Sequence, residues 1–317
     1  MKIVILEGHA VNPGDLSWDH FKQFGEVVVY ERTNRDEVVE RTKDADCILS
    51  NKTVFNEALL SQLPNLKYIG VMATGTNVID IEAARNHGVI VTNIPSYSTD
   101  SVAQLMFAHL LNVLNRVDKY ANEIRDGRWA DSGDFCYWDG KIRELASMSL
   151  GIVGLGSIGN RVAQIALAFG MNVYAYTSKS VNELPCGVQK STLNGLFNSC
   201  DVISLHCPLT PETRGMINKE TLAMMRPETI LINTGRGPLV NEADVAEALN
   251  NGTIAAYATD VMSKEPPQKD NPLFACKNAF ITPHLAWGTI EARKRLINIA
   301  VENVKSYCDG KPKNVVK

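Results

Sequence analysis

Short apolar runs alternate with polar stretches along the first part of the chain. These runs predict β-strands at Ile3–Leu6, Glu26–Tyr30, Cys47–Ser50, Tyr68–Val71 and Val89–Thr92. Helical patterns over Asn56–Leu63 and Ile81–His87 separate some of them, and Gly88 stands where a helix-ending glycine is expected. Strands that alternate with helices indicate βαβ units and a parallel sheet.

A second series of the same kind begins at Ser149. Its strands are predicted at Leu150–Val153, Asn172–Tyr176, Val202–His206, Thr229–Ile232, Ala255–Thr259 and Ala279–Ile281. Apolar residues at steps of three and four from Val102 to Val117 predict one long helix that starts at Thr99, and another helix is predicted over Thr289–Tyr307. Asp126–Lys141 is aromatic and aperiodic, which predicts an extended loop. We therefore expect two α/β domains.

Composition and charge narrow the function classes. The 317 residues are 45% hydrophobic, and 32 basic residues nearly balance 35 acidic ones, so nucleic acid and anionic membranes are not predicted as partners. No apolar run approaches the roughly 18 residues of a membrane span. The seven cysteines are scattered and lack C-x-x-C spacing, which predicts reduced thiols in a cytoplasmic protein and no metal site.

A glycine-rich turn stands between a predicted strand and a predicted helix. Apolar spacing predicts that the buried face of this helix is made of Ile158, Val162, Ile165, Ala166 and Phe169. The turn reads Gly154-Leu155-Gly156-Ser157-Ile158-Gly159, the G-x-G-x-x-G pattern of dinucleotide-binding folds. In this pattern the first glycine makes a tight turn, the second lets the backbone approach a pyrophosphate, and the third lets helix and strand pack. The free N–H groups at the helix start then face the phosphates. The alternative is a glycine-rich turn without a ligand.

The residues that follow the next strand bear on the choice of cofactor. An acid about 20 residues after the glycine turn usually binds the ribose of NAD. Here the strand ends in Thr177-Ser178-Lys179, so hydroxyl donors and a positive charge replace that acid. We therefore expect NAD(H) or NADP(H) as cofactor, with NADP(H) accepted. The alternative is that these three are solvated loop residues.

Polar residues also follow three later strands. Arg236 lies between Gly235 and Gly237 after one strand, Asp260 and Glu265 follow the next, and His284 follows the third. Taken alone, an arginine is more often a surface charge, and a histidine more often has a structural role. Together they point to a site, because open α/β sheets bind ligands at the carboxyl ends of their strands.

On these motifs the chain resembles the D-isomer-specific 2-hydroxyacid dehydrogenase family, glycerate dehydrogenase (hydroxypyruvate reductase) branch. The resemblance covers almost the whole chain and rests on Gly154–Gly159, Leu205–Thr210, Asn233–Gly237, Asp260, Glu265, Pro283–Trp287, Ala73–Asn77, Tyr97–Gln104 and Phe135–Trp138. It implies two Rossmann-like, doubly wound parallel-sheet domains. Residues 1–98 plus 287–317 would form a flavodoxin-like substrate domain, residues 99–286 the NAD(P)-binding domain, and two chains a homodimer.

The resemblance also implies a role for each site residue. Arg236 would hold the carboxylate and carbonyl of a 2-keto acid, while His284 exchanges a proton with the carbonyl oxygen. Glu265 would hold the imidazole and favour its protonated form. Further contacts to the cofactor would come from Leu155, Ser157, Ile158, Cys207, Thr234, Gly235 and Asp260, and contacts to the substrate carboxylate from Thr74, Gly75 and Thr76. Trp138 would reach across a dimer interface, unless it is a core aromatic.

The leading function is the reduction of hydroxypyruvate or glyoxylate to a D-2-hydroxy acid. Within the enzyme class, a D-lactate or phosphoglycerate-type dehydrogenase is the alternative. A nicotinamide-sensing binding protein, like the corepressors that resemble this family, is the alternative from another class. Such proteins can keep the same three site residues, so turnover has to decide.

Overall fold

The computed structural model describes residues 1–317, which form two compact units. One unit comprises Met1–Ser98 and Trp287–Lys317, and the other comprises Thr99–Ala286. Each is built on a parallel sheet with helices, so the predicted α/β fold class is confirmed.

The first unit has a five-stranded sheet in the order β2-β1-β3-β4-β5. This is the flavodoxin-like order. Its strands are β1 (Lys2–Ile5), β2 (Glu26–Val29), β3 (Cys47–Ser50), β4 (Tyr68–Val71) and β5 (Ile90–Thr92). Its α-helices are α1 (Gly8–Val11), α2 (Val38–Thr42), α3 (Glu57–Leu60), α4 (Ile81–Asn86) and α11 (Ile290–Cys308).

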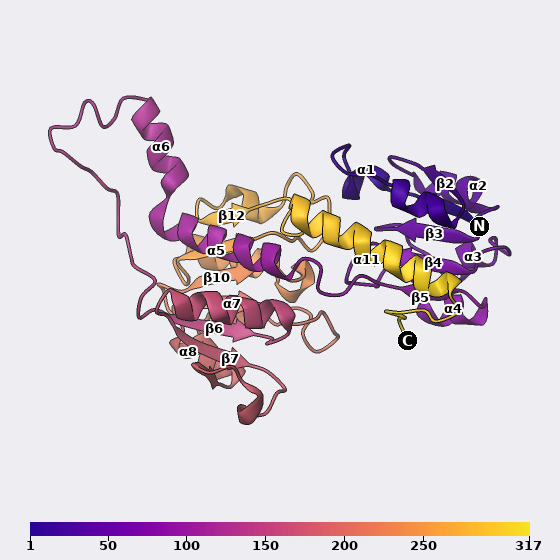
Figure 1. Cartoon of the computed structure of the whole chain (residues 1–317). Helices are drawn as coiled ribbons and strands as arrows, with labels where there is room; N and C mark the ends of the chain where they lie inside the picture. The colour runs from indigo at the N-terminus through magenta and orange to yellow at the C-terminus, as the bar shows by residue number, and fades with distance from the viewer. The chain divides into compact units, whose positions relative to one another are not determined.

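Helix α11 completes the core of this unit, and Figure 1 shows it running along the sheet. Its buried face is made of Ala292, Leu296, Ile297, Ala300 and Val304, which join Ile3, Ile5, Leu49 and Tyr68 in one apolar cluster. The same face buries Arg293, whose guanidinium forms two hydrogen bonds of 2.6 Å with the carboxylate of Asp15. Arg293 is thus both buried and paired, as a buried cation must be.

The second unit has a seven-stranded sheet in the order β12-β11-β10-β9-β6-β7-β8. Its strands are β6 (Ser149–Val153), β7 (Asn172–Tyr176), β8 (Val188–Lys190), β9 (Val202–Leu205), β10 (Ile230–Asn233), β11 (Ala256–Thr259) and β12 (Ala279–Ile281). Its α-helices are α5 (Thr99–Asn115), α6 (Val117–Arg125), α7 (Ser157–Ala168), α8 (Leu193–Ser199), α9 (Lys219–Leu222) and α10 (Glu242–Asn250). Strand β8 at the sheet edge was not predicted.

Two expectations about helices are wrong. The predicted helix through Val117 ends at Asn115, because Arg116 adopts a left-handed conformation with φ of 49° and a separate helix α6 follows. Phe169, which we expected on the buried face of α7, is 42% exposed. Its ring instead stacks on Phe107 of the neighbouring helix α5, with ring centroids 5.5 Å apart.

Helix α6 and the loop after it extend away from the strands of the second unit (Figure 1), and we call them the exposed aromatic segment. No residue of α6 is buried, and in the loop Phe135 is 89% and Trp138 61% exposed. Trp138 is therefore not a core aromatic. Asp139 fixes the loop by accepting hydrogen bonds of 2.7 Å from both terminal nitrogens of Arg128.

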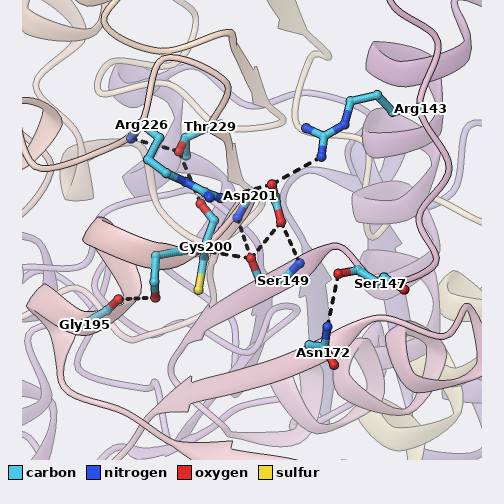
Figure 2. A network of polar contacts seen from close by, with 10 residues as sticks. Arg143, Ser147, Ser149, Asn172, Gly195, Cys200, Asp201, Arg226 and Thr229 are labelled. Atoms are coloured by element: carbon cyan, nitrogen blue, oxygen red, sulfur yellow. Dashed lines mark hydrogen bonds and ion pairs between the residues drawn. The ribbon is translucent and has the colours of Figure 1, made fainter.

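A polar network ties the amino ends of the central strands together (Figure 2). Asp201, just before β9, accepts hydrogen bonds of 2.8 Å from the backbone N–H and the hydroxyl of Ser149 at the start of β6. Arg143 and Arg226 lie 3.3 Å and 3.0 Å from the same carboxylate. The network therefore stabilises the amino ends of these strands. The expected site residues lie at the opposite, carboxyl ends.

Three further properties follow from the side chains and helices. All seven cysteines are free thiols. No three His, Cys, Asp or Glu side chains gather in a way that could hold a metal ion. No helix combines the length and apolar composition needed to cross a bilayer.

Candidate active site

The glycine turn joins β6 to α7, and at two of its positions a side chain would clash with the backbone of the chain. Gly154 has φ of 95°, and a Cβ there would lie 2.6 Å from the backbone nitrogen of Cys207. A Cβ on Gly159 would lie 2.2 Å from the carbonyl oxygen of Gly154. By contrast, a Cβ on Gly156 would meet no protein atom within 4 Å. The space beside Gly156 is therefore open, and it lies at the start of α7, where free N–H groups favour a phosphate.

Buried polar atoms without partners lie at the ends of neighbouring strands. Thr234, after β10, is buried, and its Oγ1 has no hydrogen-bond partner in the chain. His206, after β9, binds Ser204 Oγ through Nε2 at 2.8 Å but leaves Nδ1 without a partner. Burial lowers the pKa of His206 to about 4, so its ring is neutral at pH 7. Unpaired buried polar atoms are costly, so a ligand that pairs with them fits here.

Two lysines border the turn after β7. Lys179 donates its backbone N–H to Thr177 Oγ1 at 3.3 Å, which closes the Thr177-Ser178-Lys179 turn. Lys190, the last residue of β8, donates its Nζ to the carbonyl of Lys179 at 2.5 Å. Sequence reasoning missed Lys190 because it missed β8. The signal available was only the three-residue run Val188–Lys190 after Gly187.

The Arg236 turn is held by the buried side chain of Asn233. Its Oδ1 accepts from Gly235 N–H, and its Nδ2 donates to the carbonyl of Arg236, both at 3.0 Å. The half-buried guanidinium of Arg236 binds its neighbour Gly235 through Nη1 at 2.8 Å. A guanidinium carries five N–H donors in a fixed fork, and this bond to Gly235 occupies only one nitrogen, so the group suits an anion.

Gly237 brings this turn against the loop that carries Glu265. A Cβ on Gly237 would lie 2.0 Å from the carbonyl carbon of Met262, so only glycine fits. The N–H of Met262 donates to Glu265 Oε1 at 3.1 Å, and Glu265 Oε2 lies 2.7 Å from His284 Nδ1. The structure thus joins the loops of all three predicted catalytic residues within one unit.

His284 lies in a turn that is anchored by a buried carboxylate. Asp260, 1% exposed, accepts from Thr282 Oγ1 at 2.6 Å and from Leu285 N–H at 2.9 Å on Oδ1, and from Ala286 N–H at 2.8 Å on Oδ2. The His284 and Glu265 side chains remain 29% and 32% exposed. The His284–Glu265 pair is therefore accessible to a substrate, while the Asp260 carboxylate that anchors the His284 turn is buried.

The predicted substrate loop follows β4 in the first unit. Thr74 Oγ1 donates to the carbonyl of Ile94 at 2.8 Å, and the side chain of Asn93 donates to the carbonyl of Thr74, also at 2.8 Å. Thr74 thus uses its hydroxyl inside the unit, which leaves the main chain of Thr74, Gly75 and Thr76 as the part suited to an anion.

A parallel sheet with this glycine turn, and with an Arg and a Glu–His pair at its carboxyl edge, defines a dinucleotide-dependent oxidoreductase. The family model "D-isomer specific 2-hydroxyacid dehydrogenase, NAD binding domain" matches residues 107–286. The chain belongs to the D-isomer-specific 2-hydroxyacid dehydrogenases, so its cofactor is a nicotinamide dinucleotide. The resemblance found in the sequence is confirmed.

Named relatives match the chain over its full length. A hydroxypyruvate reductase of Blautia hydrogenotrophica is 43% identical, covering 100% of this chain and 99% of the relative. A glycerate dehydrogenase of Methylorubrum extorquens is 38% identical, covering 100% and 99%. Among solved structures, an acyclic imino acid reductase in complex with NADPH and D-Arg matches with a TM-score of 0.87 and 28% identity, covering 100% of both chains.

Proposed function

We propose that this protein reduces a small 2-keto acid, hydroxypyruvate or glyoxylate, to the D-2-hydroxy acid. The observation that carries the proposal is the 2.7 Å contact between His284 Nδ1 and Glu265 Oε2, in a loop packed against the Arg236 turn. Such a pair provides a positioned proton donor, and the adjacent guanidinium provides an anion-binding fork. The full-length relatives named hydroxypyruvate reductase and glycerate dehydrogenase support this choice of substrate.

The residues of the second unit fit a nicotinamide dinucleotide. The open space beside Gly156 and the start of α7 suit a pyrophosphate, with Gly154, Leu155, Ser157, Ile158 and Gly159 forming the turn. Thr234, Gly235 and Cys207 follow the neighbouring strands β10 and β9. The unpaired Oγ1 of Thr234 suits a polar group of the dinucleotide there. Asp260 accepts three hydrogen bonds within the chain, so about one of a carboxylate's four acceptor positions remains for a ligand amide. When bound, the cofactor supplies or accepts a hydride.

His284 moves the proton that balances the hydride. Since Nδ1 faces Glu265, Nε2 is the nitrogen that gives a proton to the carbonyl oxygen during reduction and takes it from the alcohol in reverse. Glu265 holds the ring and stabilises its positive charge. Arg236 binds the substrate carboxylate and polarises the carbonyl through Nε and Nη2. Backbone N–H groups of Thr74, Gly75 and Thr76 are the second proposed grip on the carboxylate.

We also propose that NADPH is accepted alongside NADH. The turn after β7 offers the hydroxyls of Thr177 and Ser178 and the charge of Lys179, and Lys190 adds a second cation beside it. No acid stands at Thr177 to repel a 2′-phosphate. The imino acid reductase with the same fold was solved with NADPH.

A homodimer in a reducing, cytoplasmic compartment completes the proposal. The exposed aromatic segment around Phe135 and Trp138 and the unburied helix α6 offer an apolar surface to a second copy. The seven free thiols suit a reducing compartment. Sedimentation at micromolar concentration should give twice the mass of the chain, and a monomer would refute the dimer.

The decisive experiment is a turnover assay that follows NADH and NADPH oxidation separately. Hydroxypyruvate and glyoxylate should be reduced faster than pyruvate or phosphohydroxypyruvate. A preference for either of the latter would favour the D-lactate or phosphoglycerate alternative. Cofactor binding without turnover of any acid would favour a nicotinamide-sensing protein.

The matched variant for this assay is His284→Asn. Asparagine tolerates the left-handed backbone of His284, at φ of 53°, so the turn should persist. We expect kcat to fall by about 10²–10⁴-fold, which is what a positioned acid–base contributes. The Kd for NADH should stay within about twofold, because His284 is remote from the phosphate turn in the proposed complex. Near-normal turnover in the folded variant would remove His284 from the mechanism.

A further inference from the structure

A line of hydrogen bonds runs from helix α5 to the turn that carries His284. Nε2 of the buried His109 lies 3.0 Å from Thr282 Oγ1, and Thr282 Oγ1 donates to Asp260 Oδ1 at 2.6 Å. A threonine hydroxyl has one hydrogen, and here Asp260 receives it. Thr282 must therefore accept from His109, which places a proton on Nε2 of that ring.

Two of the three donors to Asp260 lie directly after His284 in the chain. They are the backbone N–H groups of Leu285 and Ala286, which bind opposite oxygens of the carboxylate. His284 itself has a φ of 53°, a conformation that costs energy for most residues other than glycine. The carboxylate thus clamps a strained turn, and the hydroxyl of Thr282 supplies its third bond.

We propose that Thr282 and His109 are positioning residues that hold Asp260 so that its carboxylate fixes the His284 turn for proton transfer. This inference rests on the proposed role of His284 as the proton donor. Neither residue touches the reacting atoms in this scheme, and both act through Asp260. His109 suits the role because burial lowers its pKa, which keeps the ring neutral with a single N–H to direct at Thr282.

These side chains do more than fill space, because His109 donates to Thr282 and Thr282 donates to Asp260. If Thr282 lost its hydroxyl, Asp260 would keep only its two backbone donors, and the N–H of His109 would be left unpaired in the interior. Both effects loosen the Asp260 carboxylate, and a small displacement of a catalytic group can lower a rate by about 10²-fold.

Matched pairs of variants test the proposal. Thr282→Val removes the hydroxyl at constant shape, whereas Thr282→Ser keeps it. His109→Leu removes the donor, whereas His109→Gln retains an N–H. We expect kcat to fall by about 10- to 100-fold in Thr282→Val and by a smaller factor in His109→Leu, with Ser and Gln restoring most of it. The Kd for NADH should rise by less than about threefold, well below the loss in kcat, because Asp260 is only one of the proposed cofactor contacts and the glycine turn is unchanged.

A double variant separates positioning from general structure. If Thr282 acts through His284, then Thr282→Val combined with His284→Asn should be no slower than His284→Asn alone. A wild-type kcat in Thr282→Val, a failure of serine to restore activity, or additive losses in the double variant would each overturn the proposal.

A measurement without turnover keeps this test independent of the proposed reaction. Amide hydrogen exchange at Leu285 and Ala286 should speed up at least about tenfold in Thr282→Val but not in Thr282→Ser, because their acceptor has loosened. Unchanged exchange would refute the clamp even in an active enzyme. Faster exchange in a protein inactive on 2-keto acids would retain the clamp and refute only the proposed function.

Discussion

The two carboxylate oxygens of Glu265 have different partners, one in its own loop and the other on His284. Oε1 accepts the N–H of Met262 at 3.1 Å, and Oε2 lies 2.7 Å from His284 Nδ1. The loop therefore fixes the glutamate, and the glutamate fixes the ring. A substitution at Glu265 should disturb the charge and the orientation of His284 together.

Glu265→Gln should lower kcat for keto-acid reduction by about 10²-fold. Glutamine can still bond the ring, but it does not stabilise the imidazolium, and it lets the ring adopt the wrong tautomer. The measurement is kcat with saturating NADH, together with the Kd of NADH, which should stay unchanged. Lys264→Gln changes the exposed neighbouring residue and is the control. Equal activity of the two variants would show that Glu265 has no part in proton transfer.

Arg236→Lys should lower kcat/KM for keto acids by about 10- to 10³-fold. Lysine keeps the charge but loses the fork that Nε and Nη2 offer, and each charge-assisted hydrogen bond contributes about 1.5–3 kcal/mol. Arg85→Lys, on the exposed surface of α4, is the control and should behave as wild type. If kcat/KM is unchanged in Arg236→Lys, the substrate carboxylate is held elsewhere.

Gly156→Ala should weaken dinucleotide binding without affecting the fold. Its Cβ would meet no protein atom, so the melting temperature should match that of Gly133→Ala, which also adds a methyl group in open space. The Kd of NADH, followed by fluorescence, should rise at least about tenfold because the methyl occupies the proposed pyrophosphate space. Gly159→Ala should instead lower the melting temperature, since its Cβ clashes with the carbonyl of Gly154. Wild-type affinity in Gly156→Ala would exclude this turn as the phosphate site.

Thr177→Asp should shift cofactor preference towards NADH, mainly by raising KM for NADPH about 10- to 100-fold. A carboxylate there accepts from ribose hydroxyls and repels a 2′-phosphate. Lys190→Gln should raise KM for NADPH by a smaller factor and leave that for NADH almost unchanged. The ratio of kcat/KM for the two cofactors measures both effects. A wild type that strongly prefers NADH would contradict the proposed NADPH acceptance.

Asp201→Asn should destabilise the second unit by about 1–3 kcal/mol at pH 7. Asparagine has only one accepting oxygen, so it cannot accept all of the bonds that Figure 2 draws to the Asp201 carboxylate. Burial raises the pKa of Asp201, but bonds from Ser149 and the charge of Arg226 outweigh it, so the pKa lies below its ordinary value. A lowered pKa in the folded state adds stability above the ordinary aspartate range, and this is lost as pH falls.

Thermal unfolding at several pH values measures this loss. The difference in melting temperature between wild type and Asp201→Asn should therefore shrink below about pH 4. A difference that is independent of pH would mean that the charge of Asp201 does not contribute.

Most strands of the two parallel sheets, and the places where the candidate site residues follow them, could be predicted from the sequence, because these features rest on local patterns. Arg236, Glu265 and His284 each follow a strong apolar strand, and parallel strands bring their carboxyl ends to one edge. Strand β8 was missed because it has three residues, of which only Val188 is buried. The break at Arg116 was missed because the apolar spacing continues through it.

The support of the site could not be predicted. His109 and Thr282 are 173 residues apart in sequence, and their contact depends on how α5 packs on the sheet. Nothing in either local pattern marks them, since a histidine on an apolar helix face usually has a structural role. Hydrogen bonds of this kind follow from tertiary packing, which sequence periodicity does not record.

The division of the chain into units has a consequence for synthesis on the ribosome. The second unit is one continuous segment, Thr99–Ala286, whereas the first needs both Met1–Ser98 and the later helix α11. Translation therefore delivers a complete second unit while the sheet of the first still exposes Ile3, Ile5 and Leu49, the residues that α11 covers. A nascent chain stalled before Ile290 should bind chaperones through this face, and release of α11 should end that binding.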